Sequence, residues 1–118
     1  MINDTLIVNV EERDQAVIIT IDGILSYNGN DEFDNSFRKY AHSKLDVIAL
    51  NLKNVLYIDS FGMSRIIKVS RAFIDTRTDF VLINLSDYML HIFKITTLDK
   101  IFKIMNDKEF LAKYFSEE

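Results

Sequence analysis

The strongest constraint on the fold is a junction between an apolar run and a long amphipathic segment. Residues 47–52 are apolar except for Asn51, which is typical of a buried strand. From Ser60 onward, apolar residues recur at intervals of three and four, which indicates a helix. Asp59 and Ser60 stand where this helix begins, and their side-chain oxygens can accept hydrogen bonds from its unpaired N–H groups. The sequence therefore predicts a buried strand, a tight turn over residues 57–63 and a helix that leaves the turn.

The turn also places a hydroxyl group at the start of a helix. Ser60 is expected to be exposed there, where the helix dipole tolerates negative charge, so it is well placed to be phosphorylated and read by another protein. Helix capping alone also explains an aspartate followed by a serine, because such caps are common and need no partner. The residues by themselves leave both interpretations open.

The rest of the chain alternates between strand-like and helix-like segments. Strands are expected at residues 6–10, 16–21, 47–52 and 80–85, and helices at 30–41, 60–76, 87–95 and 108–115. Residues 98–105 fit neither pattern fully, and a short strand there stays an open alternative. We therefore predict an α/β fold with a mixed sheet of four to five strands and packed helices, in which the first two strands form an antiparallel hairpin. Residues 47–52 or 80–85 should form the central strand, because both are strongly apolar.

On a helical wheel, residues 60–76 have two unlike sides. The side expected to pack on the sheet holds Met63, Ile66, Ile67, Ser70, Phe73 and Ile74. The opposite side holds Phe61, Arg65, Lys68 and Ala72. A solvated side would normally lack phenylalanine, so Phe61 either folds over the helix end and plugs the core or contacts a partner. The core as a whole is expected to include Ile18, Ile48, Leu50, Leu52, Ile66, Ile67, Val81, Ile83, Ile92 and Phe93.

Composition and charge argue against several classes of function. The net charge of −4 is unlike that of a protein with a broad nucleic-acid footprint. No apolar run approaches the roughly 18 residues of a membrane helix, so we expect no membrane insertion. The N-terminus lacks the basic start and apolar core of a signal peptide, and the chain contains no cysteine for disulfides. These features fit a cytoplasmic protein.

The residues that usually carry catalysis or bind cofactors form no recognisable site. His42 and His91 are far apart in the sequence, and neither has the spacing of a metal ligand. Ser60 lacks the Gly-x-Ser-x-Gly surroundings of a hydrolase nucleophile, and no glycine-rich nucleotide-binding motif is present. The acidic residues within positions 31–34 fit the ordinary first turn of a helix. We therefore expect no enzyme activity, no metal and no cofactor.

The turn and its surroundings resemble the signature of STAS domains, the family of bacterial anti-sigma-factor antagonists. That signature is a strand ending in Asn/Asp-Leu, a short connection, an aromatic-x-Asp-Ser-Ser/Thr/Ala-Gly-Leu motif and a helix. The matching residues are Asn51, Leu52, Tyr57, Asp59, Ser60, Gly62 and Met63. Residues 17–23, 80–86 and 98–104 resemble further family segments, in the family's order and spacing. The resemblance covers most of the chain and implies a single STAS domain over residues 1–118.

The resemblance also implies a mechanism. In the family, an anti-sigma factor that is an ATP-dependent serine kinase binds the unphosphorylated domain and releases its sigma factor. The kinase phosphorylates the serine that Ser60 matches, and a metal-dependent phosphoserine phosphatase reverses the modification. The chain is then expected to be a non-catalytic anti-sigma factor antagonist that switches partners, and a monomer or weak dimer. Its expected partner-binding residues are Asp59, Ser60, Phe61, Gly62, Met63, Arg65, Lys68 and Ala72.

Three departures from the signature leave a second function open. Phe61 stands where the family has a small residue, and residues 62–64 read Gly-Met-Ser in place of Gly-Leu-Gly. The acidic residue that often follows the second strand is replaced by Ser26, while Asn28 matches an asparagine of the family. The alternative function is a non-catalytic STAS interaction or scaffold module in a signalling or lipid-transport complex. The bulky Phe61 favours this alternative, whereas the retained aspartate and serine favour the phosphorylation switch.

Overall fold

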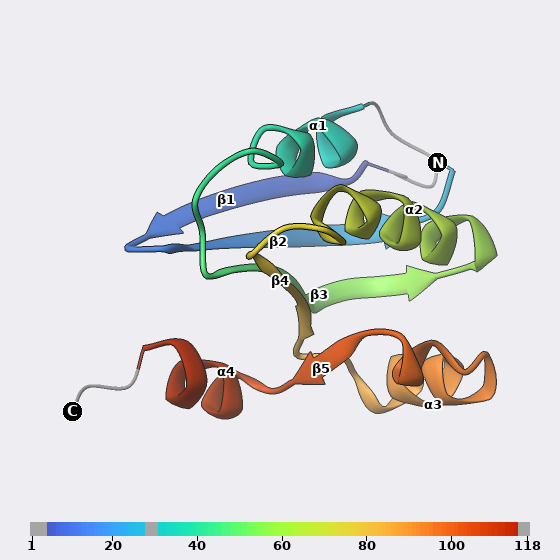
Figure 1. Ribbon diagram of the computed structural model, residues 1–118. Helices are drawn as coiled ribbons and strands as arrows, with labels where there is room; N and C mark the ends of the chain where they lie inside the picture. The colour runs from blue at the N-terminus through green and yellow to red at the C-terminus, as the bar shows by residue number, and fades with distance from the viewer. Residues whose placement is uncertain (1–4, 28–30, 116–118) are drawn as a thin grey trace.

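The structure, a computed structural model, describes residues 5–27 and 31–115, which contain a five-stranded sheet with helices on both faces (Figure 1). The strands are β1 (Ile7–Arg13), β2 (Ala16–Leu25), β3 (Val47–Ile58), β4 (Asp79–Ile83) and β5 (Lys103–Met105), and they lie in that order across the sheet. β1 pairs antiparallel with β2, and the other neighbours pair parallel. The predicted mixed sheet is confirmed, and residues 47–52 lie in its central strand, β3.

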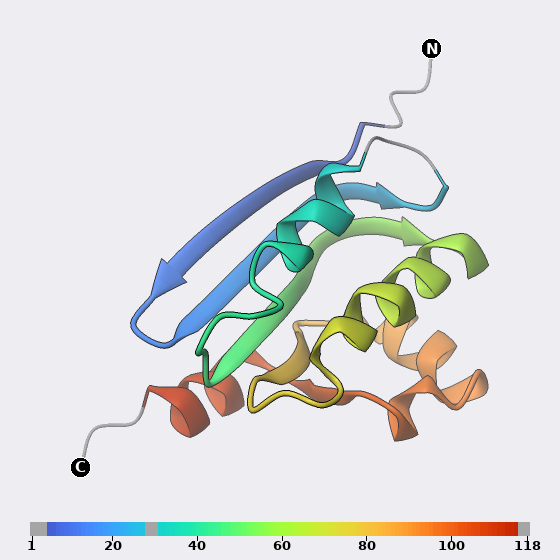
Figure 2. The same cartoon turned by 45° about the horizontal axis from the view of Figure 1, so that its top comes forward.

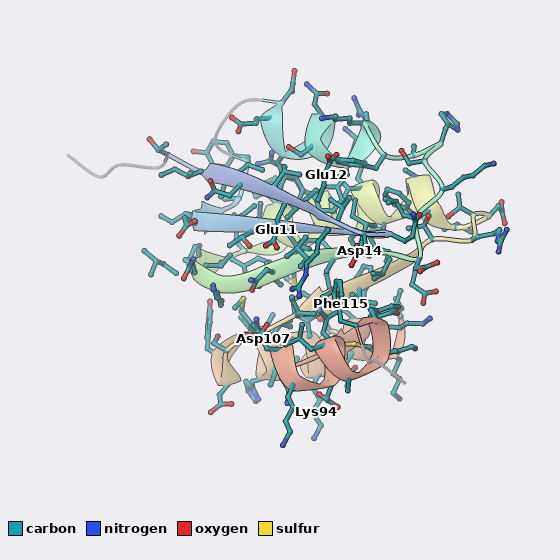
Figure 3. All side chains as sticks on the ribbon, turned by 90° about the vertical axis from the view of Figure 1, so that its left-hand side faces the viewer. Glu11, Glu12, Asp14, Lys94, Asp107 and Phe115 are labelled. Atoms are coloured by element: carbon teal, nitrogen blue, oxygen red, sulfur yellow. The ribbon has the colours of Figure 1, made fainter. Side chains whose placement is uncertain are left out.

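The helices of the described residues lie on opposite faces of this sheet. They are α1 (Glu32–Arg38), α2 (Ser60–Ser70), α3 (Asp87–Ile95) and α4 (Asp107–Tyr114), with short 3₁₀ turns η1 (Arg71–Phe73) and η2 (Leu98–Lys100). α1 and α2 lie side by side over one face, and α4 lies on the other side of the sheet (Figures 1 and 2). Figure 3 shows Phe115, the residue after Tyr114, between α4 and the sheet, where it packs against the core.

The core forms one layer on each face of the sheet. The larger layer, under α1, α2 and α3, includes Ile48 and Leu50 of β3. The smaller layer, under α4, includes Val47 and Ala49 of the same strand. Because successive side chains of a strand point to opposite faces, one continuous apolar run fills both layers. This explains why residues 47–52 are so strongly apolar.

Three strands are longer than the sequence pattern predicts, and one of them is β1, which ends at Arg13 and not at position 10. β2 continues to Leu25 and β3 to Ile58, because their last residues pair with each other beyond the end of β4. The pairing is irregular at two points, where β3 has an extra residue opposite β2. Exposed Lys53 and Asn54 interrupt the apolar pattern of β3, and this interruption explains why the predicted strand ended too early.

Helix boundaries also differ from the prediction. α1 ends at Arg38, before the predicted end at position 41, and its predicted start at position 30 lies outside the described residues. α2 ends at Ser70 and continues only into η1, although the pattern predicted a helix to position 76. The ambiguous residues 98–105 divide into η2 and β5, so the fifth strand is confirmed.

The buried side of α2 matches the predicted one only in part: Ile66 and Phe73 are buried as predicted, but the centre of the buried stripe differs. Gly62, Ile66 and Val69 are buried, and Phe73 in η1 continues the same stripe. With about 100° per residue, this stripe is rotated by roughly 70° from the predicted core side. The wheel consequently missed Val69 and placed Ile74 in the core, although Ile74 is exposed.

Most other predicted core residues are buried. Ile18, Ile67 and Ile92 are only partly buried and pack against the edges of the two core layers. Ala72, predicted on the outer side, is also partly buried against the larger layer. These shifts follow from the same rotation of α2, except at Ile18 and Ile92, which lie on other elements.

Candidate functional site

The junction between β3 and α2 has the capping geometry that the sequence predicts. Asp59 is extended and immediately precedes α2, whose first residue is Ser60. The Asp59 Oδ1 atom accepts a hydrogen bond of 3.0 Å from the backbone N–H of Gly62, so the aspartate caps the helix. Ser60 is exposed at the N-terminal end of α2, where the helix dipole favours a negative charge.

Gly62 brings the first turn of α2 against the end of β2. A Cβ atom on Gly62 would lie 2.1 Å from the carbonyl oxygen of Leu25 and 2.9 Å from the side chain of Ile58. Backbone atoms cannot yield to such a contact, so only glycine allows this close approach. The glycine of the Asp-Ser-x-Gly motif is therefore required by packing. The approach that it permits sets both the position and the rotation of α2.

Ser26, the residue after β2, lies beside the same turn. Its hydroxyl donates a hydrogen bond to the Asp59 Oδ2 atom, so both carboxylate oxygens of Asp59 accept hydrogen bonds. The hydrogen bond from Ser26 is the main reason why the pKa of Asp59 lies below its usual value. The backbone N–H groups of Gly62 and Phe61 also lower this pKa, whereas desolvation opposes the shift. Asp59 is therefore ionised at neutral pH.

The sequence pointed to position 26 without revealing this contact. It showed a serine in place of the family's acidic residue, which by itself identifies no hydrogen-bond partner. Ser26 and Asp59 are 33 positions apart in the chain, and the late part of the β2–β3 pairing brings them together. Asn28, the other family position, lies outside the described residues.

Arg65 does not lie on a solvated side of α2, contrary to the wheel. Its side chain is 17% exposed. The Nη1 atom donates a 3.0 Å hydrogen bond to the backbone carbonyl of Ser26, and the guanidinium carbon lies 5.0 Å from the ring centroid of Phe33 in α1. These contacts hold Arg65 between α1, α2 and the end of β2.

Asp34 of α1 is surrounded by three cations. Its carboxylate lies 3.3 Å from the Lys68 Nζ atom, 3.9 Å from the Arg65 Nε atom and 3.9 Å from the Arg38 Nη2 atom. The Asp34 side chain is 14% exposed, and its Oδ1 atom is buried without a hydrogen bond. The sequence pattern assigned Asp34 to an ordinary acidic first turn. It could not show that this carboxylate joins α1 to α2.

Phe61 forms an exposed aromatic pair beside Ser60. Its side chain is 59% exposed, and its ring meets that of the still more exposed Tyr27 edge-to-face, with centroids 5.8 Å apart. The interpretation of Phe61 as a plug for the core is therefore wrong. An exposed aromatic pair next to a helix terminus is a feature that partner surfaces use as an anchor.

The structure separates the predicted partner-binding residues by exposure. The exposed ones are Ser60, Phe61 and Lys68, the partly buried ones are Asp59, Met63, Arg65 and Ala72, and Gly62 is buried. Met63 and Ala72 pack against the larger core layer. The exposed members of the set therefore present a hydroxyl and an aromatic ring at the start of α2 and an ammonium group further along the same helix.

Asn51 has contacts that explain its place in the motif. Its Oδ1 atom accepts hydrogen bonds from the Lys53 backbone N–H, at 3.1 Å, and from the Asn84 side chain, at 3.2 Å. Asn84 follows β4 in a left-handed conformation with φ of 63°. The buried Asn51 side chain thus supplies hydrogen bonds at the point where β4 leaves β3, and we assign it a structural role.

Within residues 5–27 and 31–115, no helix is long and apolar enough to cross a membrane. No group of three or more His, Cys, Asp or Glu side chains in the same ranges could hold a metal ion. A cavity of about 640 Å³, lined mainly by residues 41–46 and 76–78, lies at the end of the sheet away from Ser60.

Comparison with known proteins identifies both a family and a fold. The model of the STAS domain family matches residues 8–110. A putative anti-sigma factor antagonist from Thermotoga maritima is 22% identical, with a TM-score of 0.79 over 90% of this chain and 92% of that one. The Bacillus cell fate determinant SpoIIAA, in its phosphorylated form, is 16% identical, with a TM-score of 0.69 over 91% and 98%. A sulfate transporter family protein from Wolinella succinogenes is 15% identical, with a TM-score of 0.69 over 84% of each chain. At these identities the three likenesses concern the fold.

Proposed function

The chain belongs to the STAS domain family, and on that premise we propose that it is an anti-sigma factor antagonist controlled by phosphorylation of Ser60. In this proposal the unphosphorylated protein binds an anti-sigma serine kinase, which then releases its sigma factor. The kinase phosphorylates Ser60 and loses affinity for the product, and a phosphoserine phosphatase restores the binding form. The protein itself acts by binding, without catalysis, as a single cytoplasmic domain that is a monomer or weak dimer.

The observation that carries this proposal is the exposed Ser60 on a turn that is held by hydrogen bonds and close packing. Asp59 caps α2 and is held by Ser26, while Gly62 packs the same turn against Leu25. A kinase therefore meets the backbone of Ser60 in a defined position, and such preorganisation lowers the cost of reaching a reactive geometry. Capping alone would require Asp59 but not an exposed hydroxyl at the next position.

The electrostatics of the turn make phosphorylation an effective switch. A phosphoserine carries about −1.5 to −2 charges at pH 7. Within the protein, this charge is tolerated at the N-terminal end of α2, whose first turn contains no acidic residue. Toward a partner, the phosphate adds to the ionised carboxylate of Asp59, and burying both charges in an interface is costly. Phosphorylation can thus abolish binding while the domain stays folded.

The proposed partner surface centres on Ser60, Phe61 and Lys68. Phe61 supplies an exposed aromatic anchor, and the 61%-exposed side chain of Lys68 supplies a charge that orients the partner. Asp59, Gly62, Met63, Arg65 and Ala72 complete the proposed set by holding the turn and the helix in place.

The proposal is tested by intact mass spectrometry after incubation with an anti-sigma serine kinase, ATP and magnesium. Unmodified chain should gain the mass of one phosphate, and Ser60→Ala should gain none. The matched control is Ser64→Ala, an exposed serine one turn further along α2, which should be modified like the parent. Phosphorylation that persists in Ser60→Ala and disappears in Ser64→Ala would refute the assignment.

A second function is supported by two specific observations. Phe61 is a large exposed side chain where the family has a small residue, and the fold is shared with a sulfate transporter family protein. In this alternative the chain is a constitutive STAS interaction or scaffold module in a signalling or lipid-transport complex. It predicts that Ser60→Asp binds the partner as tightly as the parent does, whereas the phosphorylation switch predicts weaker binding.

A further inference from the structure

Ser26, the residue after β2, contacts α2 at two points and is linked to α1 through one of them. Its hydroxyl donates to Asp59 at the start of α2, and its backbone carbonyl accepts from Arg65 further along the same helix. Arg65 in turn faces Asp34 of α1, which lies beside α2 in Figure 2. We name these four residues, Asp34, Arg65, Ser26 and Asp59, the Ser26 network.

We propose that Asp34 and Arg65 are positioning residues for the Ser60 turn, residues 59–62, and that they act through Ser26. Their importance for phosphorylation rests on the function proposed above, but the positioning itself is a property of the unmodified chain. The hydrogen bond from Arg65 to the Ser26 carbonyl and the one from the Ser26 hydroxyl to Asp59 form a route from Asp34 and Arg65 to the Ser60 turn. The proposed effect on the turn uses this route, through the position of Ser26.

Arg65 has the geometry that such a role needs. A guanidinium group presents several donors in one fixed plane, so Nη1 can hold the Ser26 carbonyl while Nε faces Asp34. The stacked Phe33 ring and the low exposure of the side chain leave it few other positions. A lysine at this position has a single nitrogen and could not hold both groups in this arrangement.

Asp34 explains why the guanidinium keeps this orientation. Its largely buried carboxylate has an oxygen without a hydrogen bond, which is costly unless nearby charges compensate. Arg65, Lys68 and Arg38 supply that compensation at ion-pair distances. A buried negative charge of this kind strongly favours a cation beside it. Of the three cations around Asp34, Arg65 is the one that also donates a hydrogen bond to Ser26.

The consequence for the Ser60 turn follows from the two oxygens of Asp59. Oδ2 is held by Ser26 and Oδ1 holds the Gly62 N–H, so the aspartate rotamer and the first turn of α2 are coupled to the position of Ser26. A displaced Ser26 would release Oδ2 and loosen the cap that orients the Ser60 backbone. Through the Ser26 network, the position of the Ser60 turn therefore depends on Asp34 of α1.

The test measures two quantities in the full chain and in its Arg65→Lys and Asp34→Asn variants. The first is the pKa of the Asp59 carboxyl group, obtained by ¹³C NMR titration. The second is the hydrogen-exchange rate of the Gly62 N–H. Asp34, Arg65, Lys68 and Arg38 form one cluster of charges, so direct charge effects on Asp59 must be separated from positioning. Arg65→Lys keeps the charge, and Asp34→Asn removes a negative charge, which by Coulomb interaction alone would lower the Asp59 pKa. Positioning predicts the opposite: the Asp59 pKa rises in both variants, and Gly62 N–H exchange becomes faster.

The matched control is Arg38→Lys, which alters a partner of Asp34 that is mostly exposed and keeps the charge. It should leave both the Asp59 titration and Gly62 exchange unchanged. An unchanged Asp59 pKa in Arg65→Lys, or a lowered one in Asp34→Asn, would overturn the proposal. These measurements use unphosphorylated protein, so they test the positioning proposal even if the mass experiment refutes Ser60 as the phosphorylated residue. If Ser60 is the phosphorylated residue, the initial rate at which the kinase phosphorylates Arg65→Lys should be about tenfold lower than for the parent, because small displacements of a reacting group are costly.

Discussion

The hydroxyl of Ser26 donates a hydrogen bond to the carboxylate of Asp59, and so joins the end of β2 to the first turn of α2. Asp59 uses its other oxygen to cap the helix through the Gly62 N–H. One aspartate therefore links the sheet, the helix and the exposed serine that follows it. A neutral serine achieves this link where the STAS signature often has an acidic residue.

Removing the Ser26 hydroxyl should make stability depend less on pH. Because the pKa of Asp59 is lowered in the folded chain, its ionised form stabilises the fold above the usual aspartate pKa of about 3.9, and this stabilisation is lost as pH falls through the folded pKa. Ser26→Ala should cost about 1 kcal/mol in the free energy of unfolding at pH 7. Urea unfolding at a series of pH values should show this difference shrinking in acid. A difference that stays constant down to acid pH would show that Ser26 acts by packing alone.

Adding one methyl group at Gly62 should strongly destabilise the domain. Gly62→Ala would place Cβ 2.1 Å from the Leu25 carbonyl oxygen, so α2 must move away from β2. We expect a loss of about 1–3 kcal/mol in the free energy of unfolding, as for other overpacked sites, measured by urea denaturation. The matched control Ser64→Ala adds no bulk at an exposed position of the same helix and should change stability by less than about 0.5 kcal/mol. Equal stability of the two variants would contradict the close approach.

The rotation of α2 predicts unequal effects at two neighbouring isoleucines. Ile66 is fully buried, whereas Ile67 is only partly buried. Ile66→Ala should therefore cost about 2–5 kcal/mol, the usual range for emptying a core site, and Ile67→Ala clearly less. Thermal or urea unfolding of both variants measures the difference. Equal losses would favour the orientation predicted from the helical wheel, which placed both isoleucines on the core side.

Phe61 should matter for binding and little for stability. Its ring is mostly exposed and contacts Tyr27, which is itself open to solvent. Phe61→Ala should leave the melting temperature nearly unchanged and weaken binding of the anti-sigma kinase by more than about 1 kcal/mol, as expected for an aromatic anchor. Calorimetric titration measures the affinity, and a thermal melt of the variant alone is the control. Unchanged affinity would remove Phe61 from the proposed surface.

The part of the structure that could be predicted from the sequence is the part set by local signals. The apolar run of β3 and the Asp59 cap of α2 depend on neighbouring residues, and both were confirmed. The contacts of Ser26 and Arg65 depend on where separate elements meet, which no local pattern contains. Gly62 combines a local signal with a contact between elements. The sequence shows that the residue is a glycine, but it does not show that the glycine packs against Leu25.

The same limit explains the error in the helical wheel. The wheel assigned Arg65 to solvent because an arginine among apolar residues usually marks the exposed side. It could not include the carboxylate of Asp34 on α1, which together with the Ser26 carbonyl makes a partly buried position acceptable for a cation. Val69 was missed because the rotation of α2 is set by the contact at Gly62 and not by the apolar pattern alone.

The most direct test of the proposed switch is the affinity of the anti-sigma kinase for the chain with and without phosphate on Ser60. Both forms can be separated by ion exchange, checked by mass spectrometry and titrated calorimetrically against the same kinase preparation. We predict that phosphorylation weakens binding at least about tenfold, which corresponds to about 1.4 kcal/mol, while the melting temperature of the isolated domain does not fall. Equal affinity of the two forms would contradict the phosphorylation switch and favour a constitutive interaction module.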